Sequence, residues 1–330
     1  MSETNAVPPQ EGTEAVDRLG APYTSETLVL QPDVEGEVVA TLVHRPAEVP
    51  TSKAVLHVHG YCDYFFQTGA ADFWVRNGYD FYALDLRKYG RSLLTHQTPN
   101  YVADLTTYYE ELDLAFERIA REHHHLVFSA HSTGGLTVPL WLHDRGHRAA
   151  GVFLNAPWID MHGDAFTRLM AMPAIHRLGA YRPTRLIPRE VTGGYVRSLH
   201  RDFEGEWDFD LAWKPQSSWP VYAGWIRAVR IGQARIARGL SVDAPVLMIS
   251  SAKSGDPASA ADLGSTDVVL DVERMRRRVA QLSRHVTIVQ VPGALHDVTL
   301  SPEPVRSQVY AELQRFVSAY VDSGYVAPSR

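Results

Sequence analysis

The chain has 330 residues, of which 45% are hydrophobic and 21% are charged, and its formal net charge is −6 at pH 7. This length and composition fit one large globular domain, or one domain with an insertion, with enough apolar residues for a sizeable core. The negative charge argues against nucleic-acid binding, because a phosphate-binding surface needs a concentrated positive patch, and no stretch approaches the roughly 18 consecutive apolar residues of a membrane helix, so we expect no stable membrane insertion.

The first segment in chain order is polar, MSETNAVPPQEGTEAVDRLG. It lacks the basic start and the apolar run of a signal peptide, so we expect a flexible tail over residues 1–22 and a cytoplasmic location. Cys62 is the only cysteine of the chain. A single cysteine excludes an intramolecular disulfide and a cysteine-based metal site, and it is compatible with a reducing compartment.

Short apolar runs separated by longer helical patterns follow along most of the chain. The predicted strands are Glu37–His44, Ala54–His59, Asp80–Leu84, Leu126–Ala130, Gly151–Asn155, Val246–Ser250 and Val286–Val291. Most of these runs are continuously apolar, which is typical of parallel strands that helices cover on both faces. Helical spacing relates Leu105, Tyr108, Leu112, Phe116 and Ile119, and again Val305, Val309, Leu313, Val317 and Tyr320. We therefore expect an α/β fold with a mostly parallel sheet and an antiparallel edge formed by the first strands.

The segment 157–240 interrupts this alternation. It shows no run typical of a buried strand, and it holds five of the seven tryptophans: Trp158, Trp207, Trp213, Trp219 and Trp225. We interpret it as a largely helical cap over the sheet, which divides the core into residues 23–156 and 241–330. The alternative is that these residues form extra helices of the same core, with the many arginines facing solvent.

The stretch SAHSTGG, residues 129–135, follows a predicted strand directly and precedes a helical pattern. A nucleophilic serine on a sharp strand-to-helix turn needs small neighbours two residues away, because strand and helix come close there. Ala130 and Gly134 meet this requirement, so Ser132 is the candidate nucleophile. The alternative is an ordinary helix cap before a glycine-rich connection. We expect the side chain of His131 to point away from Ser132, since neighbouring side chains on a turn diverge.

The stretch HVHGYCDY, residues 57–64, follows the strand that begins at Ala54. A glycine after this strand can bend the backbone so that a following N–H points at a reacting carbonyl. We expect the backbone N–H groups of Tyr61 and Thr133 to hold a developing oxyanion. An ordinary strand-to-helix loop is the alternative. The stretch DLRKYGRS, which begins at Asp85, is interpreted as a structural loop beside the site.

The base and the acid are expected near the C-terminus. His296, in GALHDVTLS, lies between the last predicted strand and the terminal helix, where it can accept the serine proton. The orienting carboxylate is expected in the loop after Ser250. Candidates there are Asp267, which precedes a predicted helix, and Asp256, nearer the strand. Asp262 is a further candidate, and Asp271 is interpreted as a helix N-cap.

In this order, HVHGYCDY, DLRKYGRS, SAHSTGG, DVVLDVERM and GALHDVTLS resemble the α/β-hydrolase superfamily. Within it, the chain is most similar to the monoacylglycerol lipase, lysophospholipase and serine aminopeptidase-like group, over about residues 25–322. The resemblance implies Ser132 as nucleophile, Asp267 as orienting acid and His296 as general base. Ala130 stands where the group usually has glycine, and the loop after Ser250 is longer than the pattern.

We therefore expect a serine hydrolase of carboxylic esters, working through an acyl-enzyme on Ser132 and needing no metal or organic cofactor. The tryptophan-rich cap predicts a small-molecule substrate with an apolar portion. The same fold also carries peptidases, lactonases and acyltransferases. An aminopeptidase would need carboxylates for the substrate's amine, for which the candidates are Glu190, Glu204, Glu206 and Asp208. A non-catalytic binding protein on the same fold is the third alternative.

Overall fold

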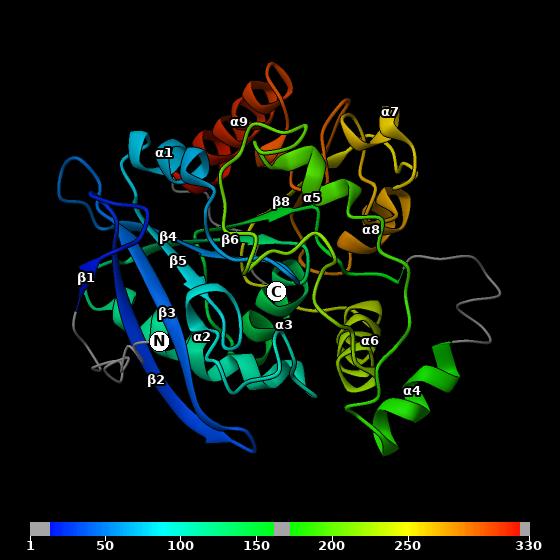
Figure 1. The fold of residues 1–330 in the computed structure, drawn as a ribbon. Helices are drawn as coiled ribbons and strands as arrows, with labels where there is room; N and C mark the ends of the chain where they lie inside the picture. Colours follow the sequence, from blue (N-terminus) through cyan, green and yellow to red (C-terminus); the bar gives the residue numbers. More distant parts are fainter. Residues whose placement is uncertain (1–13, 162–171, 324–330) are drawn as a thin grey trace.

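Within residues 14–161 and 172–323, which the computed structural model describes, nine strands form one sheet (Figure 1). Their order across the sheet is β1-β2-β3-β5-β4-β6-β7-β8-β9. The strands are β1 (Ala15–Val16), β2 (Thr24–Asp33), β3 (Gly36–Arg45), β4 (Lys53–Val58), β5 (Asp80–Asp85), β6 (His125–His131), β7 (Gly151–Asn155), β8 (Val246–Ser251) and β9 (Val286–Val291). All neighbours from β5 to β9 are parallel, whereas β1, β2 and β3 pair antiparallel. The predicted mostly parallel sheet with an antiparallel edge is confirmed.

Helices cover both faces of this sheet (Figure 1). The α-helices are α1 (Thr68–Arg76), α2 (Tyr109–Ala120), α3 (Gly134–Arg145), α4 (Met172–Tyr181), α5 (Gly194–Leu199), α6 (Ala223–Ala237), α7 (Ala260–Leu263), α8 (Val272–Val279) and α9 (Val305–Phe316). Shorter helical turns are η1 (Gly90–Ser92), η2 (Leu105–Tyr108), η4 (Val298–Leu300) and the π-helical η5 (Val317–Val321). None of the described helices has the length and apolar character needed to cross a bilayer.

The two faces of the sheet bury separate apolar clusters. Successive residues of a strand point to opposite faces. In β4, Val55 therefore joins the cluster that contains α1 and α9, whereas Leu56 joins the one that contains α2, α3, α6 and α8. Because both faces are buried, the parallel strands carry apolar residues almost without interruption. This is why they were predictable from the sequence.

The N-terminal edge differs from the expected tail. Residues 1–13 of the predicted tail 1–22 lie outside the described residues, but β1 pairs with β2 in the sheet. Asp17 is 4% exposed and binds the guanidinium of Arg91 at 2.7 and 2.8 Å. Strand β2 was missed because only one face of it is buried, at Leu28 and Leu30, so polar residues interrupt its apolar pattern.

The segment between β7 and β8 contains α4, α5 and α6, and no strand occurs among its described residues. Residues 162–171 of the predicted cap lie outside the described residues. Helix α6 buries Trp225 and Val229 in the same cluster as α3. Around α5, Leu199 and Phe209 pack instead against Tyr64 and Leu295, which belong to loops at the carboxyl ends of the parallel strands. This part of the segment therefore covers the edge of the sheet where the predicted site lies.

Candidate active site

Ser132 lies in the tight turn between the end of β6 and the start of α3. Its φ angle is 51°, in the left-handed region that residues other than glycine rarely adopt. The turn is held on both sides, because the Ser132 N–H donates to the Asn155 carbonyl at 3.1 Å and the Ser132 carbonyl accepts from the Trp158 N–H at 2.8 Å. Such a conformation persists only where its surroundings fix it, and it is common at functional sites.

The neighbours of Ser132 are small for a steric reason. A Cβ on Gly134 would lie 2.5 Å from the carbonyl oxygens of both Val58 and His59. Helix α3 therefore starts in direct contact with the end of β4, and only glycine fits at this position. Ala130, two residues before the serine, is fully buried. The size pattern that singled out Ser132 in the sequence thus has its cause in this close approach.

The structure brings Ser132, His296 and Asp267 together. Oγ of Ser132 lies 3.2 Å from Nε2 of His296. On the other side of the ring, Nδ1 of His296 lies 3.0 Å from Oδ2 of Asp267. Because a carboxylate only accepts, Nδ1 carries a proton, and in the neutral ring Nε2 is free to accept the serine proton. Ser132 is 8% exposed and His296 is 3% exposed, so little solvent competes for this contact.

Asp267 is held as a charged acceptor. Its Oδ1 accepts hydrogen bonds from the backbone N–H groups of Val269 and Leu270, each at 2.8 Å. Burial alone would raise the pKa of Asp267. The charge and hydrogen bond of His296 and the two backbone donors outweigh burial and lower this pKa below its ordinary value. The carboxylate can therefore orient His296 and stabilise the protonated ring.

The other aspartates of this loop make different contacts. Asp256 accepts from the backbone of Ala258 at 2.9 Å, and Asp262 accepts from the backbone of Asp256 at 3.1 Å. Asp271 caps α8, as expected from the sequence. Of the three candidates Asp267, Asp256 and Asp262, the structure therefore places Asp267 on His296.

The predicted oxyanion donors lie on the two segments that meet at Ser132. Gly60 is so close that a Cβ on it would lie 2.8 Å from Cβ of the serine, which brings the backbone before Tyr61 against the nucleophile. Thr133 follows the serine directly and is the N-cap of α3. Within the described chain, no hydrogen bond from the backbone N–H of Tyr61 or Thr133 is found. Both donors are thus available to a ligand.

Two loops beside the site are tied together by buried polar residues whose role the sequence did not define. His59 donates from Nδ1 to the Gly60 carbonyl at 2.8 Å and accepts at Nε2 from the Leu86 N–H at 3.0 Å. Asp85 accepts from the Phe65 N–H at 2.8 Å and from the Arg91 guanidinium at 2.8 Å. These bonds fix the loop that carries Tyr61, which agrees with the structural interpretation of Asp85.

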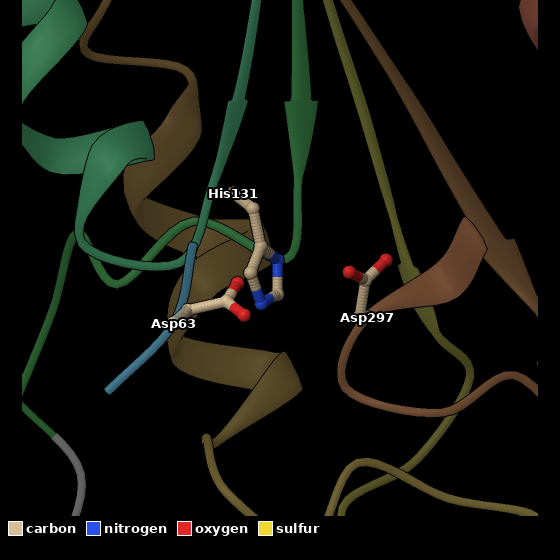
Figure 2. A group of neighbouring side chains, drawn as sticks. All are labelled: Asp63, His131 and Asp297. Carbon is tan, nitrogen blue, oxygen red and sulfur yellow. The ribbon is translucent and has the colours of Figure 1, made fainter. Parts of the chain in front are cut away.

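A buried polar cluster adjoins His296. Figure 2 shows the imidazole of His131 between the carboxylates of Asp63 and Asp297. Nδ1 of His131 donates to the Asn155 carbonyl at 3.0 Å, and its ring lies 4.8 Å from that of His296. The sequence did not reveal this cluster, because its members come from three separate segments. Its one visible signal was the aspartate that follows His296 directly.

The ligand atoms of Asp63, His131 and Asp297 lie within 4.8 Å of one another, a spacing that would also suit a metal ion. A positive charge is already present there, since Nζ of Lys214 lies 2.7 Å from Oδ1 of Asp63. Both oxygens of Asp297 also accept hydrogen bonds. Of these carboxylate oxygens, only Oδ2 of Asp63 is without a partner among the described residues. We therefore interpret the cluster as an ionic and hydrogen-bonded network.

The carboxylates considered for binding a substrate amine lie on the surface. Glu204 pairs with Arg197 at 2.6 Å, Glu206 with Arg306 at 2.8 Å and Asp208 with Arg201 at 2.9 Å. These carboxylate side chains are all more than half exposed. Glu190 is also exposed. This segment therefore uses the three paired carboxylates in surface ion pairs rather than beside Ser132.

A comparison with protein families matches residues 50–253 to the family described as serine aminopeptidase, S33. No curated protein matches the chain. A solved structure of a soluble variant of monoglyceride lipase from Saccharomyces cerevisiae, in complex with a substrate analogue, aligns with a TM-score of 0.65 at 16% identity. The alignment covers 90% of this chain and 96% of that one.

Two further solved structures are similar. Monoacylglycerol lipase from Paleococcus ferrophilus aligns with a TM-score of 0.64 at 17% identity, covering 84% of this chain and 99% of that one. Est1E from Butyrivibrio proteoclasticus, solved with bound ferulic acid, aligns with a TM-score of 0.55 at 15% identity, covering 89% and 99%. At these identities the likeness concerns the fold.

Proposed function

The chain belongs to the serine aminopeptidase S33 family and has the α/β-hydrolase fold, and from this premise we propose that it is a serine hydrolase of carboxylic esters. The observation that carries the proposal is the position of His296, with Ser132 Oγ at 3.2 Å from one ring nitrogen and Asp267 at 3.0 Å from the other. A serine hydroxyl becomes an effective nucleophile when such an oriented base takes its proton.

In the proposed reaction, Nε2 of His296 takes the proton of Ser132 as Oγ attacks the ester carbonyl. The N–H groups of Tyr61 and Thr133 stabilise the oxyanion, which matters most in the transition state, where the negative charge develops. The intermediate collapses when His296 gives its proton to the leaving alkoxide, and the acyl group stays on Ser132. Water then attacks this acyl ester with His296 as base, and the carboxylic acid is released.

An aromatic wall beside the nucleophile supports a substrate with an apolar portion. The ring of Tyr61 lies 4.2 Å from that of Trp225, and Trp225 lies 5.6 Å from Trp158. Trp158 is bonded through its backbone to Ser132 itself. Trp225 itself is buried in the core, but Tyr61 and Trp158 are half-buried, and aromatic side chains with part of their surface free supply apolar contact area to a ligand. We propose that the segment 157–240, which provides both tryptophans, acts as a cap that selects the substrate.

An aminopeptidase is the second candidate, because the matching family carries that description. It would need a carboxylate close to the serine to bind the free amine of a peptide. Glu204, Glu206 and Asp208 are engaged with arginines at the surface, which favours the ester.

The proposal is tested with p-nitrophenyl esters of graded acyl length, beside aminoacyl p-nitroanilides as peptide-like substrates. We expect ester hydrolysis that depends on chain length, and loss of that activity in Ser132→Ala. Preference for the anilides would identify an aminopeptidase instead. Equal activity of Ser132→Ala and wild type would refute the assigned nucleophile. A wild-type protein without any hydrolytic activity would support a binding protein on this fold.

A further inference from the structure

Asp297, the residue after the proposed base, is a buried loop residue whose carboxylate is fully engaged in hydrogen bonds. Its side chain is 2% exposed. Oδ1 accepts from Nδ2 of Asn155 at 2.6 Å and from the backbone N–H and hydroxyl of Thr299 at 3.0 and 2.6 Å. Oδ2 accepts from Nε2 of Gln67 at 3.2 Å. One carboxylate therefore takes four hydrogen bonds from three residues.

These bonds join the loop that carries His296 to the end of β7 and to the residue before α1. Asn155 is the last residue of β7, and its carbonyl also holds the Ser132 N–H. Its Oδ1 accepts from the Val298 N–H at 3.0 Å, so the Asn155 side chain makes two hydrogen bonds to this loop. Gln67 is the N-cap of α1 and accepts from the Phe66 N–H at 2.9 Å. Asp297 thus fixes the loop of the base relative to the strand that supports the serine turn.

The carboxylate stays ionised although it is buried. Burial alone would raise the pKa of Asp297, but the nearby His131 and the hydrogen bonds from Thr299 and Asn155 lower it to about 2. Charged acceptors make hydrogen bonds about twice as strong as neutral ones. A neutral side chain of the same shape would therefore hold this loop less firmly.

We propose that Asp297 is a positioning residue, whose carboxylate holds the His296 loop so that Nε2 of the base stays in reach of Ser132 Oγ. The inference rests on the proposed function and extends it by one residue. The reason is geometric, because a displacement of about 1 Å between reacting groups can lower a rate by roughly 100-fold. Without the carboxylate, the hydrogen bonds that join the loop between β9 and α9 to Gln67 and Asn155 become weaker.

A double replacement moves the negative charge from position 297 to position 67 and keeps a hydrogen bond between the two side chains. In Asp297→Asn, the new amide would face the amide of Gln67, donor against donor. In Gln67→Glu, two carboxylates would face each other. When Asp297→Asn and Gln67→Glu are combined, the amide at position 297 donates to the carboxylate at position 67, which can still accept from the Phe66 N–H. The bonds from Asn155 and Thr299 to position 297 are also preserved.

A matched control exists at Asp104, which caps η2 as Asp297 caps η4. Asp104 accepts from the backbone N–H and the hydroxyl of Thr106, each at 2.9 Å, in the same two-residue pattern as Asp297 with Thr299. It is exposed and lies outside the proposed site. Asp104→Asn therefore reports what the loss of such a cap does to stability alone.

The test measures kcat and KM for a p-nitrophenyl ester, and the melting temperature, for all variants. We expect Asp297→Asn to lower kcat by about 10- to 100-fold with KM within about twofold of wild type, as for groups that orient a catalytic residue. Gln67→Glu should also lower kcat, and the double variant should be faster than either single variant, which is a coupling between the two positions, but slower than wild type, because Asn155 and Thr299 then donate to a neutral acceptor. Asp104→Asn should keep the wild-type kcat.

Two results overturn the inference while the proposed function stands. One is a folded Asp297→Asn with the wild-type kcat, and the other is a double variant no faster than the slower single variant. If wild-type protein neither hydrolyses esters nor reacts with a fluorophosphonate at Ser132, the proposed function fails and this inference fails with it.

Discussion

Oδ2 of Asp267 lies 3.0 Å from Nδ1 of His296, although the two residues are far apart along the chain. Asp267 is fully buried, and two backbone N–H groups hold its other oxygen. Oδ2 therefore accepts the hydrogen bond from the histidine. This contact selects the proton position of the ring and leaves Nε2 facing the serine.

Asp267→Asn should lower kcat by roughly 10⁴-fold, because an amide donor at this position favours the ring form with the proton on Nε2, as in the aspartate-to-asparagine change of the serine protease triad. The measurement is kcat and KM for a p-nitrophenyl ester. Asp256→Asn is the matched control, since it changes an exposed aspartate of the same loop, and it should keep the wild-type kcat. The opposite ranking of the two variants would assign the acid to Asp256.

Gly134→Ala should lower the free energy of unfolding by about 3 kcal/mol, because the new methyl group would lie 2.5 Å from two backbone carbonyl oxygens and an overpacked site typically costs about 1–3 kcal/mol. Ester hydrolysis should fall as well, since the shift would separate the Tyr61 loop from Ser132. Urea unfolding measures the first effect. Gly264→Ala, where a Cβ meets nothing within 4 Å, should change stability by less than about 0.5 kcal/mol.

Tyr61→Phe tests whether Tyr61 acts through its backbone. The hydroxyl donates to the carbonyls of Trp219 and Pro220 at 3.2 and 2.8 Å, so its loss should lower the free energy of unfolding by about 1 kcal/mol. The backbone N–H is unchanged, and kcat should therefore stay within about threefold of wild type. A loss of more than about 100-fold, with the protein folded, would place the hydroxyl in the reaction.

His57 should make the protein less stable in mild acid. Its ring is buried next to Phe65 and Phe81, and Nε2 has no hydrogen-bond partner among the described residues. Burial lowers the pKa of His57 from 6.5 to about 4. Between these values the unfolded chain binds a proton that the folded chain does not. The free energy of unfolding should therefore fall as the pH decreases through this window, by about 3 kcal/mol in total.

Urea unfolding at a series of pH values measures this effect. In His57→Asn, which cannot titrate, the fall between about pH 6.5 and about pH 4 should be smaller by about the same 3 kcal/mol. Curves that run parallel for the two proteins would show that another group causes the acid sensitivity.

The parallel part of the sheet was predictable because its cause is local. Strands such as β6 are buried on both faces, and this burial requires an apolar residue at almost every position. The same holds for the turn at Ser132, whose small neighbours reflect a close approach of β4 and α3. Strand β2 was missed because half of it faces solvent, and the pairing of β1 with β2 depends on a partner strand rather than on its own residues.

Contacts between distant segments were not predictable from local pattern. Three aspartates of one loop were plausible partners of His296, and only the packing of the chain selects Asp267. Asp297 and Asn155 are 142 positions apart, and no sequence motif contains both residues. The pairing of Lys214 with Asp63 likewise joins the segment before β8 to the loop after β4. Such bonds follow from the sheet order and from the packing of the residues around α5 against the loops after β4 and β9.

The central claim is that Ser132 is the nucleophile of a serine hydrolase. It is tested most directly by reaction with a fluorophosphonate, in which the serine oxygen displaces fluoride, followed by mass spectrometry of the digested protein. We predict one phosphonylated peptide, modified at Ser132, with labelling lost in Ser132→Ala and strongly slowed in His296→Ala. Modification at another residue, or undiminished labelling of Ser132→Ala, would contradict the claim.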